Sequence, residues 1–147
     1  MRCLALLSIC FFAGGCGSLA KERELMDTAK REFAAQNYAA CEAHADEAIR
    51  LNLTSFPNME LVEKAGGSLD LRLVANQFHA RAHCRYGQGR VSEAVQDMET
   101  SVKYMAKSCQ LCLVVERGRT CRQWAEDTET LAIWKKELAA QSKQEKP

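Results

Sequence analysis

Three cysteines, Cys109, Cys112 and Cys121, lie close together in the second half of this 147-residue chain. A zinc site built on them would need a fourth ligand from elsewhere, because no histidine follows Cys121. A redox-active pair in the Cys-x-x-Cys spacing would need strands that alternate with helices, and no strands are expected. In an oxidising compartment the simplest interpretation is a structural disulfide that joins Cys121 to Cys109 or Cys112.

The N-terminus indicates the compartment. Arg2 precedes an apolar run over 4–13 and two glycines, the order typical of a secretory signal peptide. The run is too short for an ordinary membrane span. The boundary Ala13-Gly14-Gly15-Cys16 resembles the lipobox of bacterial lipoproteins, although Ala13 stands where that family usually has leucine. The alternatives are a plain signal peptide that is cut elsewhere and an uncleaved anchor over 3–20.

The lipoprotein resemblance implies that residues 1–15 are removed and that Cys16 carries acyl chains, such as palmitate. A short lead-in over 16–24 would follow. Gly17 is not the aspartate of the common inner-membrane retention signal, so the resemblance favours the outer membrane, with the protein facing the periplasm. We expect Cys41 and Cys84 to be small buried packing residues. With Cys16 lipidated, five cysteines would remain, and at least one of them would lack an intramolecular disulfide partner.

Helical spacing dominates the middle of the chain. Apolar and small residues recur three and four apart over 25–35, 38–51, 73–86 and 92–106, which predicts an all-α fold. The dipeptide Gln36-Asn37 and residues 87–90 interrupt the pattern and predict turns, with Asn37 suited to a left-handed conformation. A stripe of Trp124, Leu131, Trp134 and Leu138 predicts a further helix over 122–141. The polar tail 142–147 is expected to be disordered.

The small residues Ala29, Cys41 and Ala48 recur in kind as Ala82, Ala94 and Ser101 in a second segment. This pattern resembles the tetratricopeptide repeat (TPR), a helix-turn-helix unit of 34 residues. The resemblance implies a TPR-like domain over 25–141, with repeats over about 25–52 and 73–106, an insertion over about 53–72 and a cysteine-containing link over 107–121. The helix over 122–141 would cap the array. Arg81 of the second repeat is expected to pair with Asp97.

In the TPR family the first helix of each repeat lines a groove that binds peptides. Transferred position by position, the resemblance implies a groove lined by Arg23, Met26, Lys30, Phe33, Asn76, His79, His83 and Tyr86. His79 and His83 stand four residues apart, a spacing that can bind a metal ion. Residue 80 is alanine rather than the glutamate of a metalloprotease helix, so we expect polar surface groups here, with no metal site and no cofactor.

Composition excludes several functions. The net charge of +1 is too small to produce a positive electrostatic field that would attract nucleic acid. The sequence contains no nucleophile motif, phosphate-binding glycine loop or paired acids, so we do not expect an enzyme. We expect a membrane-anchored scaffold that binds a partner protein or peptide in the cell envelope, in the assembly or maintenance of an envelope complex. The alternative is a redox or metal-handling protein that uses the three clustered cysteines. Because two repeats are few, self-association through the open edge is a further alternative.

Overall fold

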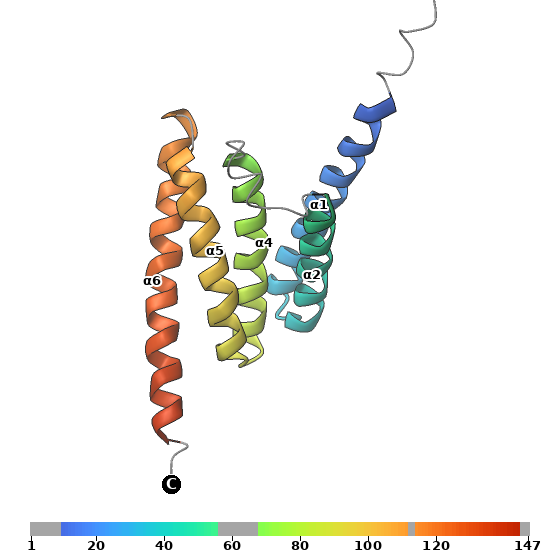
Figure 1. The fold of residues 1–147 in the computed structure, drawn as a ribbon. Helices are drawn as coiled ribbons and strands as arrows, with labels where there is room; N and C mark the ends of the chain where they lie inside the picture. Colours follow the sequence, from blue (N-terminus) through green and yellow to red (C-terminus); the bar gives the residue numbers. More distant parts are fainter. Residues whose placement is uncertain (1–9, 56–67, 112–113, 145–147) are drawn as a thin grey trace, which may run out of the picture.

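The computed structural model describes residues 10–55, 68–111 and 114–144. These ranges form helices and turns and contain no strand, which confirms the predicted all-α class (Figure 1). The helices are α1 (Cys10–Ala34), α2 (Tyr38–Ser55), α4 (Ser68–Gly87), α5 (Val91–Leu111) and α6 (Val114–Gln144).

Several helices are longer than predicted. The polar lead-in is helical, since α1 begins at Cys10. Most of the predicted link over 107–121 is helical, because α5 continues to Leu111 and α6 begins at Val114. Ser108 near the end of α5 and Thr120 near the start of α6 are buried, so the ends of both helices are packed. Residues 142–144 also continue α6, so the predicted disorder of the tail is wrong there. Residues 145–147, and the part of the insertion over 56–67, lie outside the described residues.

Two tight turns join the helices into pairs. Between α1 and α2 the left-handed residue is Gln36, with φ of 59°, rather than the predicted Asn37. Asn37 instead begins the next helix, because its carbonyl accepts the amide of Cys41 at 3.0 Å and its side chain donates to Glu32 at 2.9 Å. Between α4 and α5 the left-handed residue is Gly89, with φ of 76°, a conformation that glycine adopts without strain.

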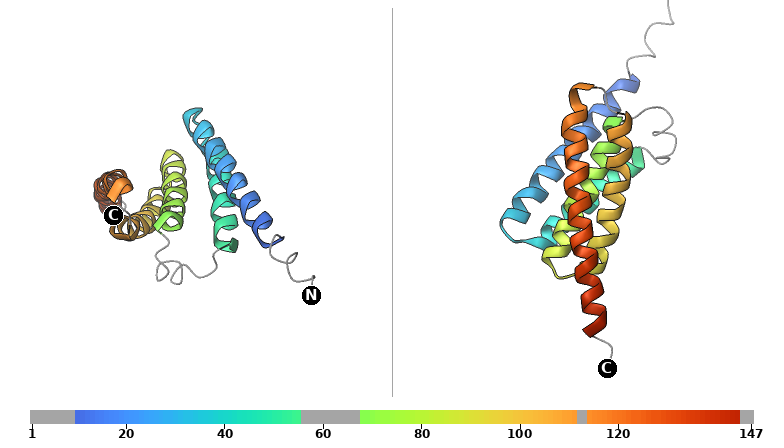
Figure 2. Two further views of the ribbon diagram at one scale, coloured as in Figure 1. Left: turned by 90° about the horizontal axis from the view of Figure 1, so that it is seen from above. Right: turned by 90° about the vertical axis from the view of Figure 1, so that its left-hand side faces the viewer.

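The helices pack in chain order, α1 on α2, α2 on α4, α4 on α5 and α5 on α6. Viewed from above, α4 lies between α1 on one side and α6 on the other (Figure 2). Glu22 of α1 fixes one end of this arrangement, since Asn52 of α2 donates to its carboxylate at 3.1 Å and Gln77 of α4 at 3.4 Å. These three side chains are buried, so the polar contact orients α1 against both neighbours.

Small residues allow the close helix packing. Ala29, Ala45, Ala48, Ala82 and Ala94 have no exposed surface. Larger side chains fill the space between α4, α5 and α6, where Val91, Val95, Met98, Leu131 and Trp134 form one cluster with Ala82 and Ala94. Leu138 packs on its edge. Trp124, predicted to share this stripe, is instead 39% exposed.

Candidate functional site

A cavity of about 710 Å³ lies between α1 and α4, within the size range of small-ligand and peptide pockets. We call it the groove. Seven of the eight predicted binding residues line it: Arg23, Met26, Lys30, Phe33, Asn76, His79 and His83. Its remaining wall residues include Leu19, Glu22, Asp27, Ala29, Cys41, Asp70, Leu73, Gln77, Ala80 and Gln123. Cys41 comes from α2 and Gln123 from α6, so four helices border the groove.

The groove combines an apolar floor with charged edges. Ala29 is fully buried, while Phe33 keeps 39% of its surface exposed. Lys30 and Asp27 stand at the edge and form an exposed ion pair at 3.6 Å, which adds little stability. Asp70 lies on the opposite wall, where burial raises the pKa of its carboxyl group. Such a surface suits a partner with an apolar side chain and flanking polar groups.

Tyr86 is the exception among the predicted residues, because it does not line the groove. Its ring stacks on Trp134 at 4.5 Å between centroids, and its hydroxyl donates to Glu137 at 2.8 Å. That hydrogen bond raises the pKa of the Tyr86 hydroxyl. The side chain therefore attaches α6 to α4. Sequence spacing alone could not reveal this, because it does not show where the last helix docks.

His79 meets a buried carboxylate from α6. Its Nδ1 lies 3.0 Å from Oδ1 of Asp127, at the distance of a hydrogen bond but without its alignment, so we treat the contact as electrostatic. Asp127 also accepts hydrogen bonds from Gln123 at 2.7 Å and from Ser101 at 3.2 Å. Burial would raise the pKa of Asp127, but these three partners outweigh it and the pKa is lowered. Asp127 is therefore an anion beside His79.

The Ser101, Asp127 and His79 contacts are not a catalytic triad. In a triad the histidine lies between the serine and the carboxylate and accepts the proton of the serine. Here Ser101 donates to the carboxylate itself and is fully buried, so it has no route to a substrate in the groove. The arrangement can orient an imidazole, but it offers no activated nucleophile.

His83 lies one turn after His79 in an aromatic setting. Its ring centroid is 4.5 Å from that of His79, 5.1 Å from that of Trp134 and 6.1 Å from that of Phe33. Burial, with a smaller contribution from His79, lowers the pKa of His83 to about 4. His83 is therefore neutral near pH 7 and closes one end of the groove between α1 and α6.

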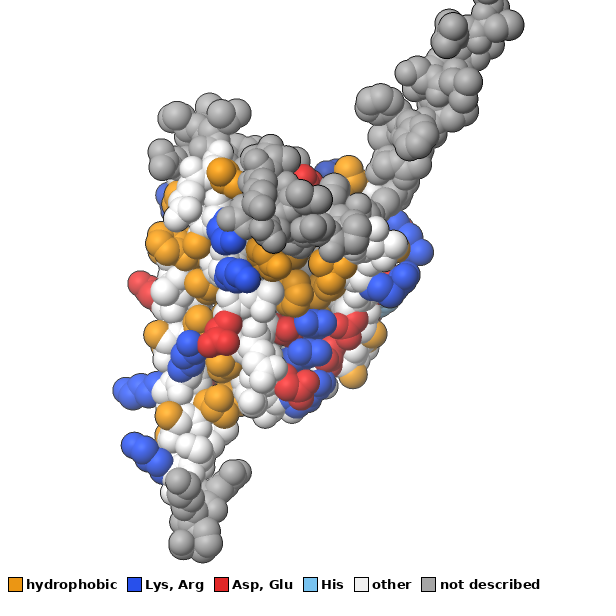
Figure 3. Space-filling model, viewed as in Figure 1, with side chains coloured by type: hydrophobic (Ala, Val, Ile, Leu, Met, Phe, Trp, Pro, Cys, Tyr) orange, Lys and Arg blue, Asp and Glu red, His pale blue; other side chains and the backbone are white. Residues whose placement is uncertain are grey.

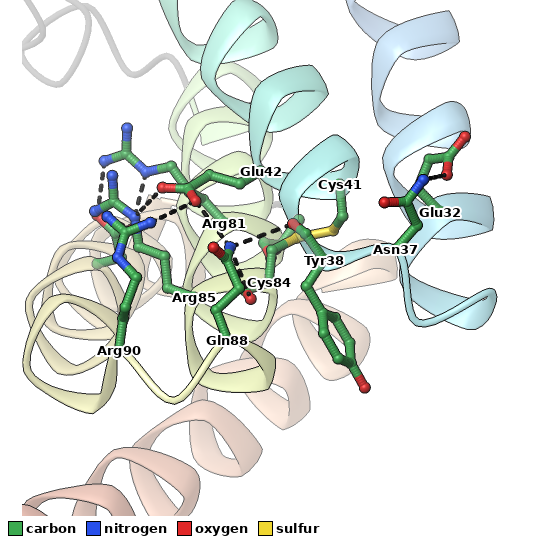
Figure 4. The surroundings of a disulfide bond; sticks show 12 residues. Glu32, Asn37, Tyr38, Cys41, Glu42, Arg81, Cys84, Arg85, Gln88 and Arg90 are labelled. Carbon is green, nitrogen blue, oxygen red and sulfur yellow. Dashed lines mark hydrogen bonds and ion pairs between the residues drawn. A yellow bond between two sulfur atoms is a disulfide. The ribbon is translucent and has the colours of Figure 1, made fainter.

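A disulfide underlies the groove and was not predicted. Cys41 of α2 and Cys84 of α4 are bonded, with Cα atoms 5.9 Å apart, so the expectation that both are unbonded packing residues is wrong (Figure 4). Both are buried beside Ala29. The bond joins the two helical hairpins covalently. No local pattern predicts this bond, because 43 residues separate the two cysteines.

The second disulfide joins Cys109 to Cys121, with Cα atoms 5.1 Å apart. This confirms one of the two pairings predicted for Cys121 and ties α5 to α6. Cys112 lies outside the described residues. Within those residues no three or more histidine, cysteine or acidic side chains gather as a metal site.

A network of charges joins the hairpins on the side of α4 that carries Cys84. The predicted pair is confirmed, since Arg81 donates to Asp97 through Nε at 2.9 Å and Nη2 at 2.6 Å. Arg85 reaches the same aspartate at 2.9 Å and Glu42 of α2 at 2.7 Å. Figure 4 shows Arg85, Arg90 and Gln88 converging on Glu42, and Figure 3 shows acidic and basic groups intermingled on the face that carries α2, α4 and α5.

The network fixes protonation as well as position. Desolvation would raise the pKa of Glu42, but the hydrogen bonds from Arg85 and Gln88 and the charge of Arg90 prevail and lower it. Likewise burial would lower the pKa of Arg81, and the hydrogen bonds to Asp97 and Asp46 raise it instead. Ionised partners therefore connect α2 to α4 and α5.

The predicted lipidation site, Cys16, lies near the start of α1, at the end that projects from the other helices in Figure 1. No helix in the described ranges is both long and apolar enough to cross a membrane. No known protein family, curated protein or solved structure matches this chain.

Proposed function

We propose that this protein is a lipid-anchored scaffold of the bacterial cell envelope, with TPR-like helical hairpins, whose groove binds a segment of a partner protein. One observation carries the proposal. Seven residues chosen by their repeat positions, on two helices far apart in sequence, line a single cavity. Met26 and Phe33 of α1 line this cavity together with Asn76 and His79 of α4.

The disulfides support an envelope location. Cys41–Cys84 and Cys109–Cys121 are both formed, and disulfides persist in the periplasm and outside cells rather than in a reducing cytoplasm. This agrees with the signal-peptide pattern over 1–15 and with acylation of Cys16. Two or three acyl chains would hold the protein firmly at the outer membrane, where it would face the periplasm.

The proposed anchor would place the groove close to the lipid surface. Cys16 precedes the groove residue Glu22 by six positions on the same helix, a rise of about 9 Å at 1.5 Å per residue. A partner in the groove would therefore be held near the membrane at a raised local concentration. This geometry suits the assembly or maintenance of an envelope complex.

The binding proposal is tested by site-specific photocrosslinking in cells. A photoreactive phenylalanine analogue replaces Met26 or Asn76 in the groove, and Lys103, exposed on α5, provides the matched control position. We expect both groove positions to crosslink the same protein, identified by mass spectrometry, and Phe33→Ala to weaken the crosslink. Equal crosslinking from Lys103, or none from the groove, would contradict the proposal.

The anchor is tested by acyl labelling and membrane fractionation of the wild type and of Cys16→Ala. We expect lipid on the wild type alone and release of Cys16→Ala from the membrane. If the wild type carries no lipid label, the proposed lipid anchor is refuted, whereas the proposal that the groove binds a partner protein is unaffected. Self-association is tested separately by sedimentation of the mature chain, where a monomer at high concentration would exclude it.

A further inference from the structure

The two groove histidines have a geometry that the proposed function does not use. His79 and His83 stand four residues apart on α4, so their side chains lie on one face of the helix, and both line the groove. Imidazole is the commonest protein ligand for divalent transition metals. An exposed histidine pair is common on helices, but three further observations distinguish this pair.

First, a buried carboxylate orients one ring. Asp127 faces Nδ1 of His79 at 3.0 Å in the electrostatic contact described above, which places the carboxylate beside Nδ1 and leaves Nε2 for coordination. Histidines that bind metals almost always direct their other nitrogen to a carboxylate, a carbonyl or a water, and the partner fixes the tautomer and strengthens the ligand. Ser101 and Gln123 hold this carboxylate in place, so it is itself rigid.

Second, the other ring is available. No residue in the described ranges forms a hydrogen bond with either nitrogen of His83, whose contacts are those of its ring faces and edges. Phe33 and Trp134 flank the ring and restrict its rotation without occupying its nitrogens. A restrained ligand loses less conformational entropy when it binds a metal ion.

Third, the spacing of the rings fits a shared ion. With a metal–nitrogen bond of about 2.1 Å, the centre of a coordinating imidazole lies about 3.2 Å from the metal. Two such rings at a bond angle of about 90° have centroids about 4.5 Å apart. The centroids of His79 and His83 are 4.5 Å apart. A right angle between neighbouring ligands is the geometry of Cu²⁺ and Ni²⁺ rather than of tetrahedral Zn²⁺.

We propose that His79 and His83 bind one divalent transition-metal ion in the groove, with Cu²⁺ bound more tightly than Ni²⁺ or Zn²⁺. The chain supplies two ligands, and water fills the other coordination positions, for which the 710 Å³ cavity provides room. The metal site does not depend on the protein-binding proposal, because this chain alone supplies both ligands, from α4, and the orienting carboxylate, from α6. A metal with open positions would also give the groove an electrophilic point for a carboxylate, imidazole or thioether of an incoming molecule.

The test uses Cu²⁺ alone with the untagged full-length chain in which Cys3→Ser, Cys10→Ser, Cys16→Ser and Cys112→Ser remove the four thiols outside the two disulfides. Titration calorimetry gives the stoichiometry and affinity, and electron paramagnetic resonance counts the equatorial nitrogens. We expect one ion with two imidazole nitrogens. His79→Gln and His83→Gln should each lower the affinity at least about 100-fold, since one intramolecular ligand is lost. His44→Gln, on α2 outside the groove, is the matched control and should change nothing.

Asp127→Asn tests the orienting role separately. It should keep the two-nitrogen signal but weaken binding about 10- to 100-fold, the effect usual for the loss of an outer carboxylate partner. The proposal is overturned if the folded chain takes up no stoichiometric Cu²⁺. It is equally overturned if the two-nitrogen signal survives in the His79→Gln/His83→Gln double variant, whose folding is checked by circular dichroism. Crosslinking from Met26 reports on the scaffold function, so the two proposals can fail independently.

Discussion

Removal of the Cys41–Cys84 bond should destabilise the protein more than removal of the Cys109–Cys121 bond. A disulfide stabilises the native state chiefly because it restricts the unfolded chain, and the effect grows with the length of the closed loop. The loops here span 43 and 12 residues. The chain-entropy relation then gives about 4 kcal/mol for the long loop and about 3 kcal/mol for the short one. Against a total stability of about 5–15 kcal/mol, the first value is a large part.

The measurement is urea unfolding of Cys41→Ala/Cys84→Ala and of the matched control Cys109→Ala/Cys121→Ala. Both are made in a background in which Cys3→Ser, Cys10→Ser, Cys16→Ser and Cys112→Ser prevent disulfide exchange. Alanine suits all four positions, since each side chain is small and those of Cys41, Cys84 and Cys109 are buried. Fluorescence of the two tryptophans and circular dichroism should give coincident transitions, the condition for two-state analysis. We expect the larger loss of unfolding free energy in the Cys41→Ala/Cys84→Ala variant.

Two results would refute this reasoning. A loss below about 1 kcal/mol for Cys41→Ala/Cys84→Ala would mean that the bond does not constrain the unfolded chain as the loop length requires. A larger loss for the control pair would mean that local packing of α5 on α6, rather than loop closure, governs the contribution. If the first variant does not fold, reductant titration of the wild type gives the same comparison, with mass spectrometry identifying which bond opens.

Three further predictions follow from single side chains. Asp97→Asn should cost about 3 kcal/mol in urea unfolding, because it leaves Arg81 and Arg85 without their shared buried anion, whereas Glu47→Gln at the exposed Arg50 pair should change nothing measurable. His83 is neutral in the folded protein down to about pH 4 but gains a proton near pH 6.5 when unfolded, so stability is full above pH 6.5 and is lost as the pH falls toward 4. In metal-free buffer, with allowance for its partial exposure, His83→Phe should reduce the loss between pH 7 and pH 5 by about 1 kcal/mol, and an unchanged slope would contradict the assignment. Trp134→Ala should cost about 3–5 kcal/mol and release α6, as seen by hydrogen exchange, whereas Trp124→Ala at a 39% exposed position should cost far less.

The sequence by itself determined the helical class, the two hairpins and most of the groove. These features depend on local spacing: small residues three and four apart mark the faces of close-packed helices, and a left-handed turn divides each hairpin. Arg81 and Asp97 could be paired because both belong to one hairpin. Cys121 could be assigned a partner because the candidates lay within 12 residues.

Only the tertiary structure decided how separate hairpins meet. The Cys41–Cys84 bond, the convergence of Arg85 and Arg90 on Glu42, and the approach of Asp127 to His79 all join residues on different hairpins or on the last helix. Their sequence separations carry no periodic signal, since they depend on the docking angle of one helix against another. Tyr86 is a further example of this limit. Its spacing predicted a position in the groove, whereas in the structure its ring stacks on Trp134 of the docked helix α6.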